Sequence, residues 1–134
     1  MDKSYVAENE AERARLKAFV GRLSDAGMAR PVGAHWTVSV GLAHLAFWDR
    51  LWLAKFDEWG RTGVVVVPQV PWWRAIAPAQ VRHEVIAAAE AADDKVRRMP
   101  VALVEAVLAT RPRTILRAVH HRQHLDELER AVTG

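Results

Sequence analysis

A chain of 134 residues is long enough for one domain with one hydrophobic core, and a hydrophobic fraction of 51% excludes intrinsic disorder. The net charge of +3 comes from 19 Lys and Arg against 16 Asp and Glu that are interleaved, so no basic face for specific nucleic-acid binding is indicated. The absence of cysteine excludes disulfides, thiolate metal sites and cysteine nucleophiles.

Neither the start of the chain nor its apolar segments predict export or membrane insertion. Residues 1–5 lead into a charged segment and contain no apolar signal core. The longest strongly apolar run, residues 64–67, is far too short to cross a bilayer. We therefore expect a soluble cytoplasmic protein.

A first helix is predicted over residues 4–26, where apolar side chains thin out toward a charged N-terminal half. Gly27 is a plausible end for this helix, because glycine readily adopts the backbone conformation that follows a helix. A loop with Pro31 and Gly33 is expected after it.

The second helix is predicted from Thr37 to Trp59. Thr37 can cap the helix by accepting a backbone hydrogen bond, and Trp36 can pack onto its first turn. Gly60 is expected to end it. Its core-facing stripe follows three- and four-residue steps and contains a histidine, in the set Val40, His44, Phe47, Trp48, Leu51 and Trp52.

Residues 60–77 form an unusually long predicted connection. Extended chain covers about 3.3 Å per residue, so this segment can travel the length of a helix of about 20 residues, and the second and third helices can run parallel. Its valine run is alternatively a short strand. Trp72 and Trp73 can cover an end of the fold, line a substrate pocket or form a dimer contact, and we favour packing or a homodimer contact.

Two further helices complete the predicted fold, which is all-α and a single domain over residues 1–134. The third begins near Pro78 and ends before Pro100, and residues 101–109 are apolar enough for one or two more turns. The fourth runs over 112–131. One side of it carries Leu116, Val119, His120, Gln123, His124 and Leu128.

The four-residue spacing of His120 and His124 is the strongest indication of function. On a helix these imidazoles share one face and can reach one metal ion. The pair alone favours one core histidine and one exposed histidine over a metal site. His44 strengthens the metal hypothesis, because it too occupies an apolar-stripe position, and core histidines need a hydrogen bond or a metal. Three imidazoles leave a fourth position open for water or substrate.

The remaining histidines are less suitable ligands. His121 points about 100° away from His120 around the helix, although an i,i+3 pair with His124 stays possible. His83 and His35 are expected at the surface. Asp49 and Asp126 are near enough in sequence to orient the ligands as outer-shell partners.

The residues around the three histidines resemble a known family. The run over residues 36–45, from Trp36-Thr37 to His44-Leu45, and the His120-x-x-x-His124-Leu125 run are similar to motifs of the DinB-like four-helix-bundle metalloenzymes. The resemblance implies an up-down-down-up topology and a divalent metal, zinc or nickel, held by His44, His120 and His124. Family members often carry a glutamate near residues 40–41, where this chain has Val40 and Gly41.

The function expected from this resemblance is a metal-dependent enzyme with a small-molecule substrate. Relatives include thiol-dependent S-transferases and the mycothiol-dependent maleylpyruvate isomerase, so the reaction is hydrolytic or a thiol-dependent transfer or isomerisation. Thiol chemistry would need a low-molecular-weight thiol cofactor, because the chain has no cysteine. The sequence identifies no catalytic base. The alternative is a non-catalytic bundle that acts as a binding or dimerisation module.

Overall fold

The computed structural model describes residues 1–66 and 78–133, and its regular structure there is almost entirely helical. The all-α prediction is therefore confirmed. Among the described residues, no helix is both long and apolar enough to span a membrane. In chain order the elements are α1 (Ser4–Arg22), α2 (Asp25–Met28), β1 (Pro31–Val32), β2 (Trp36–Thr37), α3 (Val38–Thr62), α4 (Pro78–Arg98), α5 (Val101–Thr110), α6 (Pro112–Ile115) and α7 (Arg117–Thr133).

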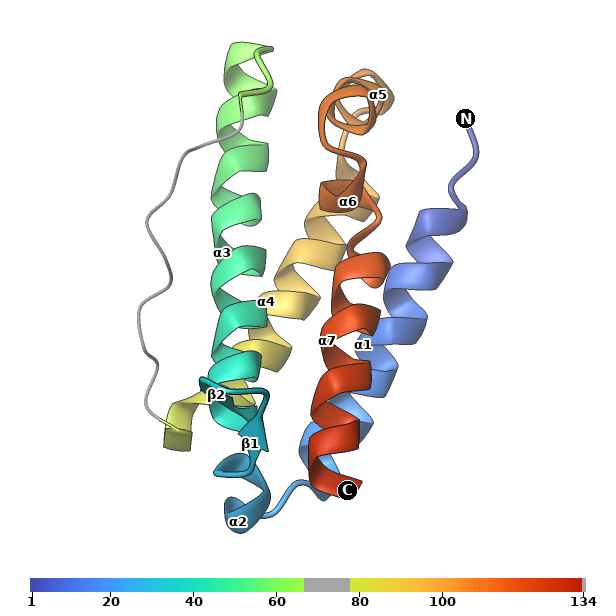
Figure 1. The fold of residues 1–134 in the computed structure, drawn as a ribbon. Coiled ribbons are helices and arrows are strands. Elements are labelled where there is room, and N and C mark those ends of the chain that lie inside the picture. The colour runs from blue at the N-terminus through green and yellow to red at the C-terminus, as the bar shows by residue number, and fades with distance from the viewer. Residues whose placement is uncertain (67–77, 134) are drawn as a thin grey trace.

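Figure 1 shows α1, α3, α4 and α7 lying side by side as the long elements of the fold. The helices α3 and α4 run in the same direction, and α1 and α7 run in the opposite one. Contacts join α3 to α4 and α7, and α1 to α4 and α7. Residues 64–66 form no strand, and the predicted roles of Trp72 and Trp73 lie outside the described residues.

The capping of α3 was predicted correctly at one end only. The Thr37 hydroxyl accepts a hydrogen bond from the Val40 amide at 3.3 Å, as expected for an N-cap. The predicted end at Gly60 is wrong, because the helix continues to Thr62. Gly63 ends it instead, with a φ of 70° that glycine adopts without steric cost.

The first predicted helix is divided in the structure. α1 ends at Arg22, and Ser24 then caps the short α2 by accepting a hydrogen bond from the Gly27 amide at 3.0 Å. Gly27 therefore lies inside a helical turn rather than ending the first helix. The strands β1 and β2 follow as an antiparallel pair that leads directly into α3, and Figure 1 shows them at one end of the long helices.

The fourth predicted helix is also divided, because the backbone departs from helical geometry at Leu116 between α6 and α7. Asn9 of α1 bridges this break. Its amide nitrogen donates to the Ile115 carbonyl, and its amide oxygen accepts from the Ala118 amide, both at 2.8 Å. The buried side chain thus satisfies backbone groups that the break leaves without helical partners.

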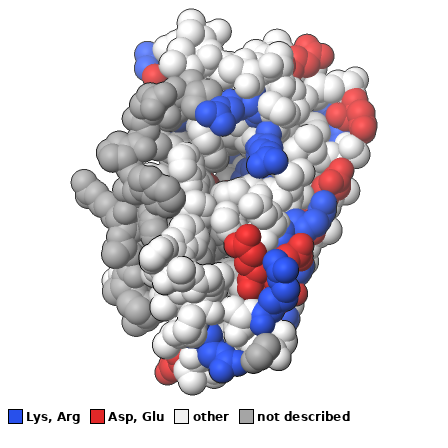
Figure 2. Space-filling model, in the orientation of Figure 1, with Lys and Arg blue, Asp and Glu red and all other residues white. Residues whose placement is uncertain are grey.

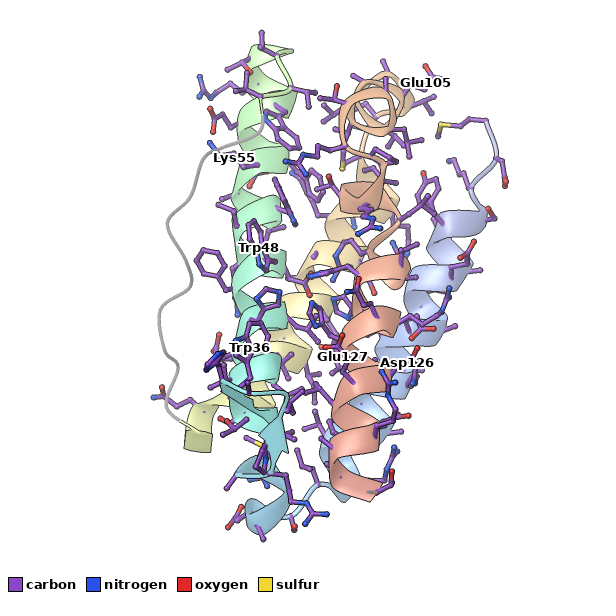
Figure 3. The ribbon with its side chains drawn as sticks, viewed as in Figure 1. Trp36, Trp48, Lys55, Glu105, Asp126 and Glu127 are labelled. Carbon is purple, nitrogen blue, oxygen red and sulfur yellow. The ribbon has the colours of Figure 1, made fainter. Side chains whose placement is uncertain are left out.

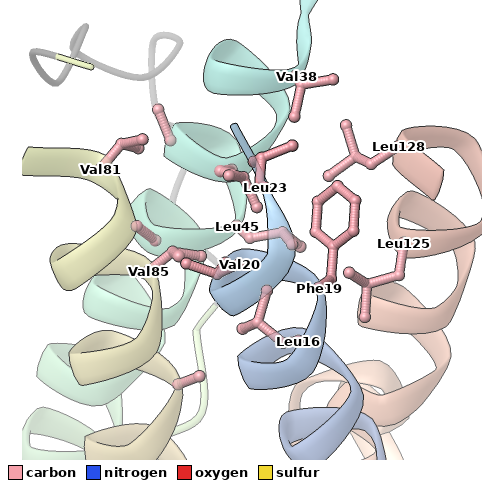
Figure 4. Close-up of a cluster of buried hydrophobic side chains, with 14 of the residues drawn as sticks. Leu16, Phe19, Val20, Leu23, Val38, Leu45, Val81, Val85, Leu125 and Leu128 are labelled. Atoms are coloured by element: carbon pink, nitrogen blue, oxygen red, sulfur yellow. The ribbon is translucent and has the colours of Figure 1, made fainter. Parts of the chain in front are cut away.

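The core lies where α1, α3, α4 and α7 meet, and Figure 4 shows Phe19 of α1 among side chains of the neighbouring helices. The buried face of α7 differs from the predicted stripe: Gln123 is exposed, and His120 and His124 are only half-buried. These two histidines consequently lie at the edge of the core. The fully buried face of α7 consists of Arg117, Ala118, His121, Leu125 and Leu128.

Candidate metal centre

The structure brings together the three histidines that the sequence singled out. His44 lies on α3 with 8% of its surface exposed, and His120 and His124 lie one turn apart on α7. One nitrogen from each ring can be chosen so that all three lie within 4.8 Å of one another. The group can therefore offer three ligand atoms to one metal ion.

A close contact between the two helices holds His44 near the other histidines. Gly41 precedes His44 by one turn on α3, and Leu128 follows His124 by one turn on α7. A Cβ atom at Gly41 would lie 2.6 Å from a methyl group of the buried Leu128. The absence of a side chain at residue 41 thus lets α3 and α7 approach closely beside the histidines.

The two histidines of α7 already contact each other through their Nε2 atoms, which are 3.1 Å apart. One ring can donate its N–H to the other in this arrangement. In a tetrahedral site with imidazole nitrogens about 2.0–2.1 Å from zinc, neighbouring ligand atoms lie about 3.3 Å apart. The observed spacing of His120 and His124 therefore suits a shared ion with little rearrangement.

The surroundings keep these imidazoles neutral at physiological pH. Burial, with repulsion from His124, lowers the pKa of His44 to about 4. Burial and the neighbouring histidines lower the pKa of His120 to about 3. Burial also lowers the pKa of His124, and the nearby Glu127 carboxylate partly offsets this effect. Neutral rings have free lone pairs, as metal ligation requires.

Aromatic side chains surround the group on the α3 side. The Trp36 ring stacks on His124 at 6.1 Å between centroids and lies 4.9 Å from the ring of His44. Trp48 meets His44 edge to face at 6.2 Å. Figure 3 labels both tryptophans beside α3. These rings contribute to the burial of His44 and His124, and burial is the main cause of the lowered pKa of both imidazoles.

Two carboxylates were predicted to orient the ligands, and the prediction for Asp126 is wrong. Asp126 is exposed and accepts a hydrogen bond from Arg15 of α1 at 2.7 Å. Its neighbour Glu127 is the carboxylate beside the group, since it lies 3.5 Å from Nδ1 of His124. Figure 3 labels both carboxylates along α7. The i,i+3 spacing from His124 to Glu127 was a signal in the sequence for this contact.

Asp49, the other predicted partner, belongs to a buried group of charges that we term the ion cluster. Its members are Asp49, Asp93, Arg117 and His121, each at most 5% exposed. Arg117 forms charged hydrogen bonds with both aspartates, at 3.0 Å between its Nε and Asp49. Burial by itself raises the pKa of Asp49, but attraction to Arg117 and His121 outweighs burial and holds the pKa well below its usual range.

The ion cluster explains why His121 is not a ligand. Its Nε2 lies 3.0 Å from the Asp49 carboxylate and 3.3 Å from Arg117, on a different side of α7 from His120. The i,i+3 alternative with His124 is therefore not the arrangement that the structure forms. His35 and His83 are exposed, as predicted.

Sequence reasoning missed most of the ion cluster. Asp93 lies between the apolar residues Ala92 and Val96 of α4, and a carboxylate near such positions was an available signal for a buried pair. Its partner Arg117 could be identified only from the folded chain, because the two residues meet across different helices.

Known proteins do not add to this picture: no family model, no curated protein and no solved structure matches the chain.

Proposed function

We propose that this protein binds one divalent metal ion, zinc or nickel, through His44, His120 and His124. The observation that carries the proposal is the convergence of three neutral imidazoles from two helices, with one nitrogen of each within 4.8 Å of the others. The donor set also fits, since neutral nitrogen ligands bind zinc and nickel well and three of them leave a position open.

We further propose that the fold is a DinB-like four-helix bundle with up-down-down-up topology. The directions of α1, α3, α4 and α7 support this, and so do the sequence motifs around the histidines. In such bundles, metal sites are built from inward-facing side chains on adjacent helices. In this protein, α3 and α7 would be the adjacent helices that supply the ligands.

The function we propose is a metal-dependent enzyme acting on a small molecule, by hydrolysis or by thiol-dependent transfer or isomerisation. When bound, the ion would act as a Lewis acid that polarises an oxygen or lowers the pKa of a coordinated water or thiol. The protein would supply orientation: Glu127 fixes the tautomer of His124, and the rings of Trp36 and Trp48 exclude water from the imidazoles. A thiol would have to come from a small cofactor, because the chain has no cysteine.

Metal analysis tests the proposal. We expect close to one zinc or nickel ion per chain after purification or reconstitution, and none in the double variant His120→Ala/His124→Ala. His83→Ala is the matched control, because it removes an exposed histidine and should leave the metal content unchanged. A wild-type protein that takes up no divalent ion even after reconstitution would refute the proposal.

One observation favours the alternative of a non-catalytic binding or dimerisation module: the contact between His120 and His124 pairs the Nε2 atoms of both rings without a metal. Thermal unfolding with and without a chelator distinguishes the metal-binding protein from the non-catalytic module. A ligated protein should unfold at a lower temperature once its metal is removed, since an ion that binds only the folded state stabilises it. An unchanged unfolding temperature favours the module.

A further inference from the structure

A hollow of about 180 Å³ opens beside His120, between α3, α6 and the start of α7. We term it the arginine hollow, since Arg111, Arg113 and Arg117 contribute to its walls together with Trp48, Trp52 and His120. Figure 2 shows blue side chains beside a hollow in this face of the molecule. The hollow adjoins the metal centre directly, because one of its walls is a proposed ligand.

The charge in the arginine hollow is unbalanced. Arg117 is neutralised by its hydrogen bonds to the buried aspartates. Arg111 and Arg113 are exposed, and within the described residues neither side chain has an ion-pair or hydrogen-bond partner. The remaining carboxylate in the wall, Asp49, already belongs to the ion cluster. Two positive charges therefore face this space without a counter-charge from the part of the chain that the structure describes.

The hollow on the other side of the histidines lacks this imbalance. It has a volume of about 580 Å³ and is lined by Trp36 and His124 among others. Its charged residues are Glu127 and Arg130, which carry opposite charges. An excess of positive charge is thus specific to the side of His120.

Two tryptophan rings form the apolar wall of the arginine hollow. Trp48 and Trp52 stack on each other at 5.6 Å between centroids and 25° between planes. A volume of 180 Å³ equals about six water molecules at roughly 30 Å³ each, or a ligand of about six to nine non-hydrogen atoms. A planar body fits against the indoles, and an anionic group suits the guanidinium groups, which bind carboxylates in a fork geometry.

We propose that the arginine hollow binds a small carboxylate with a planar, apolar body. Arg111 and Arg113 hold the carboxylate, and Trp48 and Trp52 contact the body. That this carboxylate is the substrate rests on the proposed metal-dependent function, because only then does the wall formed by His120 bring it to a reactive centre. Binding itself requires no metal.

Benzoate, with nine non-hydrogen atoms, is a suitable probe. We would titrate it into the full chain, with and without a chelator and at constant ionic strength, and follow the indole N–H signals of Trp48 and Trp52 by nuclear magnetic resonance. Phe substitutions at these two residues assign the signals. We expect saturable shifts of both signals under both conditions.

The double variant Arg111→Gln/Arg113→Gln should bind benzoate at least tenfold more weakly, because it loses both charged donors. The matched control Lys3→Gln/Arg61→Gln removes the same charge from exposed positions outside the hollow and should bind as wild type does. The absence of saturable shifts, or equal binding by the Arg111→Gln/Arg113→Gln variant, would overturn the proposal. Inorganic phosphate bound as tightly as benzoate would also overturn it, since the planar body would then contribute nothing.

The metal content of the same samples distinguishes this inference from the proposed function. Benzoate binding by a protein that takes up no metal would support the carboxylate site and refute only the metal-dependent function. A protein that takes up one ion but does not bind benzoate would refute only the carboxylate site.

Discussion

The three-histidine group and the ion cluster share a turn of α7, yet they keep polar groups inside the protein in opposite ways. In the ion cluster, Arg117 and His121 are matched to aspartates of α3 and α4, so its charges are compensated within the chain. In the histidine group the rings are neutral, and their ligand atoms face one another. The comparison indicates that the ion cluster stabilises the fold, whereas the histidines remain available to a ligand.

Removing the cation of the ion cluster should cause the largest loss of stability. Arg117→Met leaves Asp49 and Asp93 buried without their main counter-charge, so we expect the free energy of unfolding to fall by about 3–5 kcal/mol. Urea unfolding measures it. Arg122→Met is the control, because Arg122 is half exposed and its pair with Glu12 should contribute about 1 kcal/mol or less. Equal losses in the two variants would contradict a stabilising role for the cluster.

As the pH decreases, the histidine group should be the first to lower the free energy of unfolding. The pKa of folded His44 is about 4 and that of His120 about 3, both below the ordinary value of 6.5, so the unfolded chain binds more protons between these values. The free energy of unfolding of metal-free protein should therefore fall as the pH decreases from about 6.5 to about 4. Asp49 contributes mainly below this window, because its ordinary pKa of 3.8 already lies below pH 4 and its folded pKa is lower still.

Urea unfolding at a series of pH values, with a chelator present, measures this dependence. The variant His44→Gln/His120→Gln should show a flatter profile over the same range, since two of the three histidines whose pKa is lowered by burial are gone. A slope as steep as that of the wild type would show that other groups cause the dependence.

Substituting adjacent histidines should separate stability from metal binding. His121→Asn removes a hydrogen bond to the buried Asp49 and should cost about 1–3 kcal/mol while leaving metal content unchanged. His120→Asn should have the converse effect, with lower metal affinity and a smaller loss of stability. Unfolding and metal analysis of both variants check this. Loss of metal from His121→Asn would show that the division of roles is wrong.

The smallest expected effect concerns the orientation of a single ligand. Glu127→Gln weakens the contact with Nδ1 of His124 and should reduce metal affinity about tenfold, with little change in unfolding. A competition titration against a chelating dye measures the affinity. Asp126→Asn is the matched control, since this neighbouring carboxylate contacts α1 instead. Equal metal affinity in the two variants would contradict a role for Glu127 in orienting His124.

The sequence alone determined the helical class and the three histidines, because helical periodicity and the 120/124 spacing are local properties of the chain. It also placed the Thr37 cap and the ends of α4 near Pro78 and Pro100, where local backbone chemistry dominates. Its errors concern glycine, the last helix and the core-facing stripe of α3, where only His44 of the predicted residues is fully buried. Gly27 and Gly60 do not end helices, and nothing local foretells the break at Leu116, which the distant Asn9 stabilises.

Only the tertiary structure decided which polar residues share a site. Asp126 and Glu127 are neighbours in the sequence, yet Asp126 accepts a hydrogen bond from Arg15 of α1, whereas Glu127 contacts His124. His120 and His121 likewise belong to different groups, because His121 forms a hydrogen bond with Asp49 of α3. The partner of each of these residues depends on which helix packs against its side of α7. Such contacts join residues far apart in the chain, and local spacing carries no information about them.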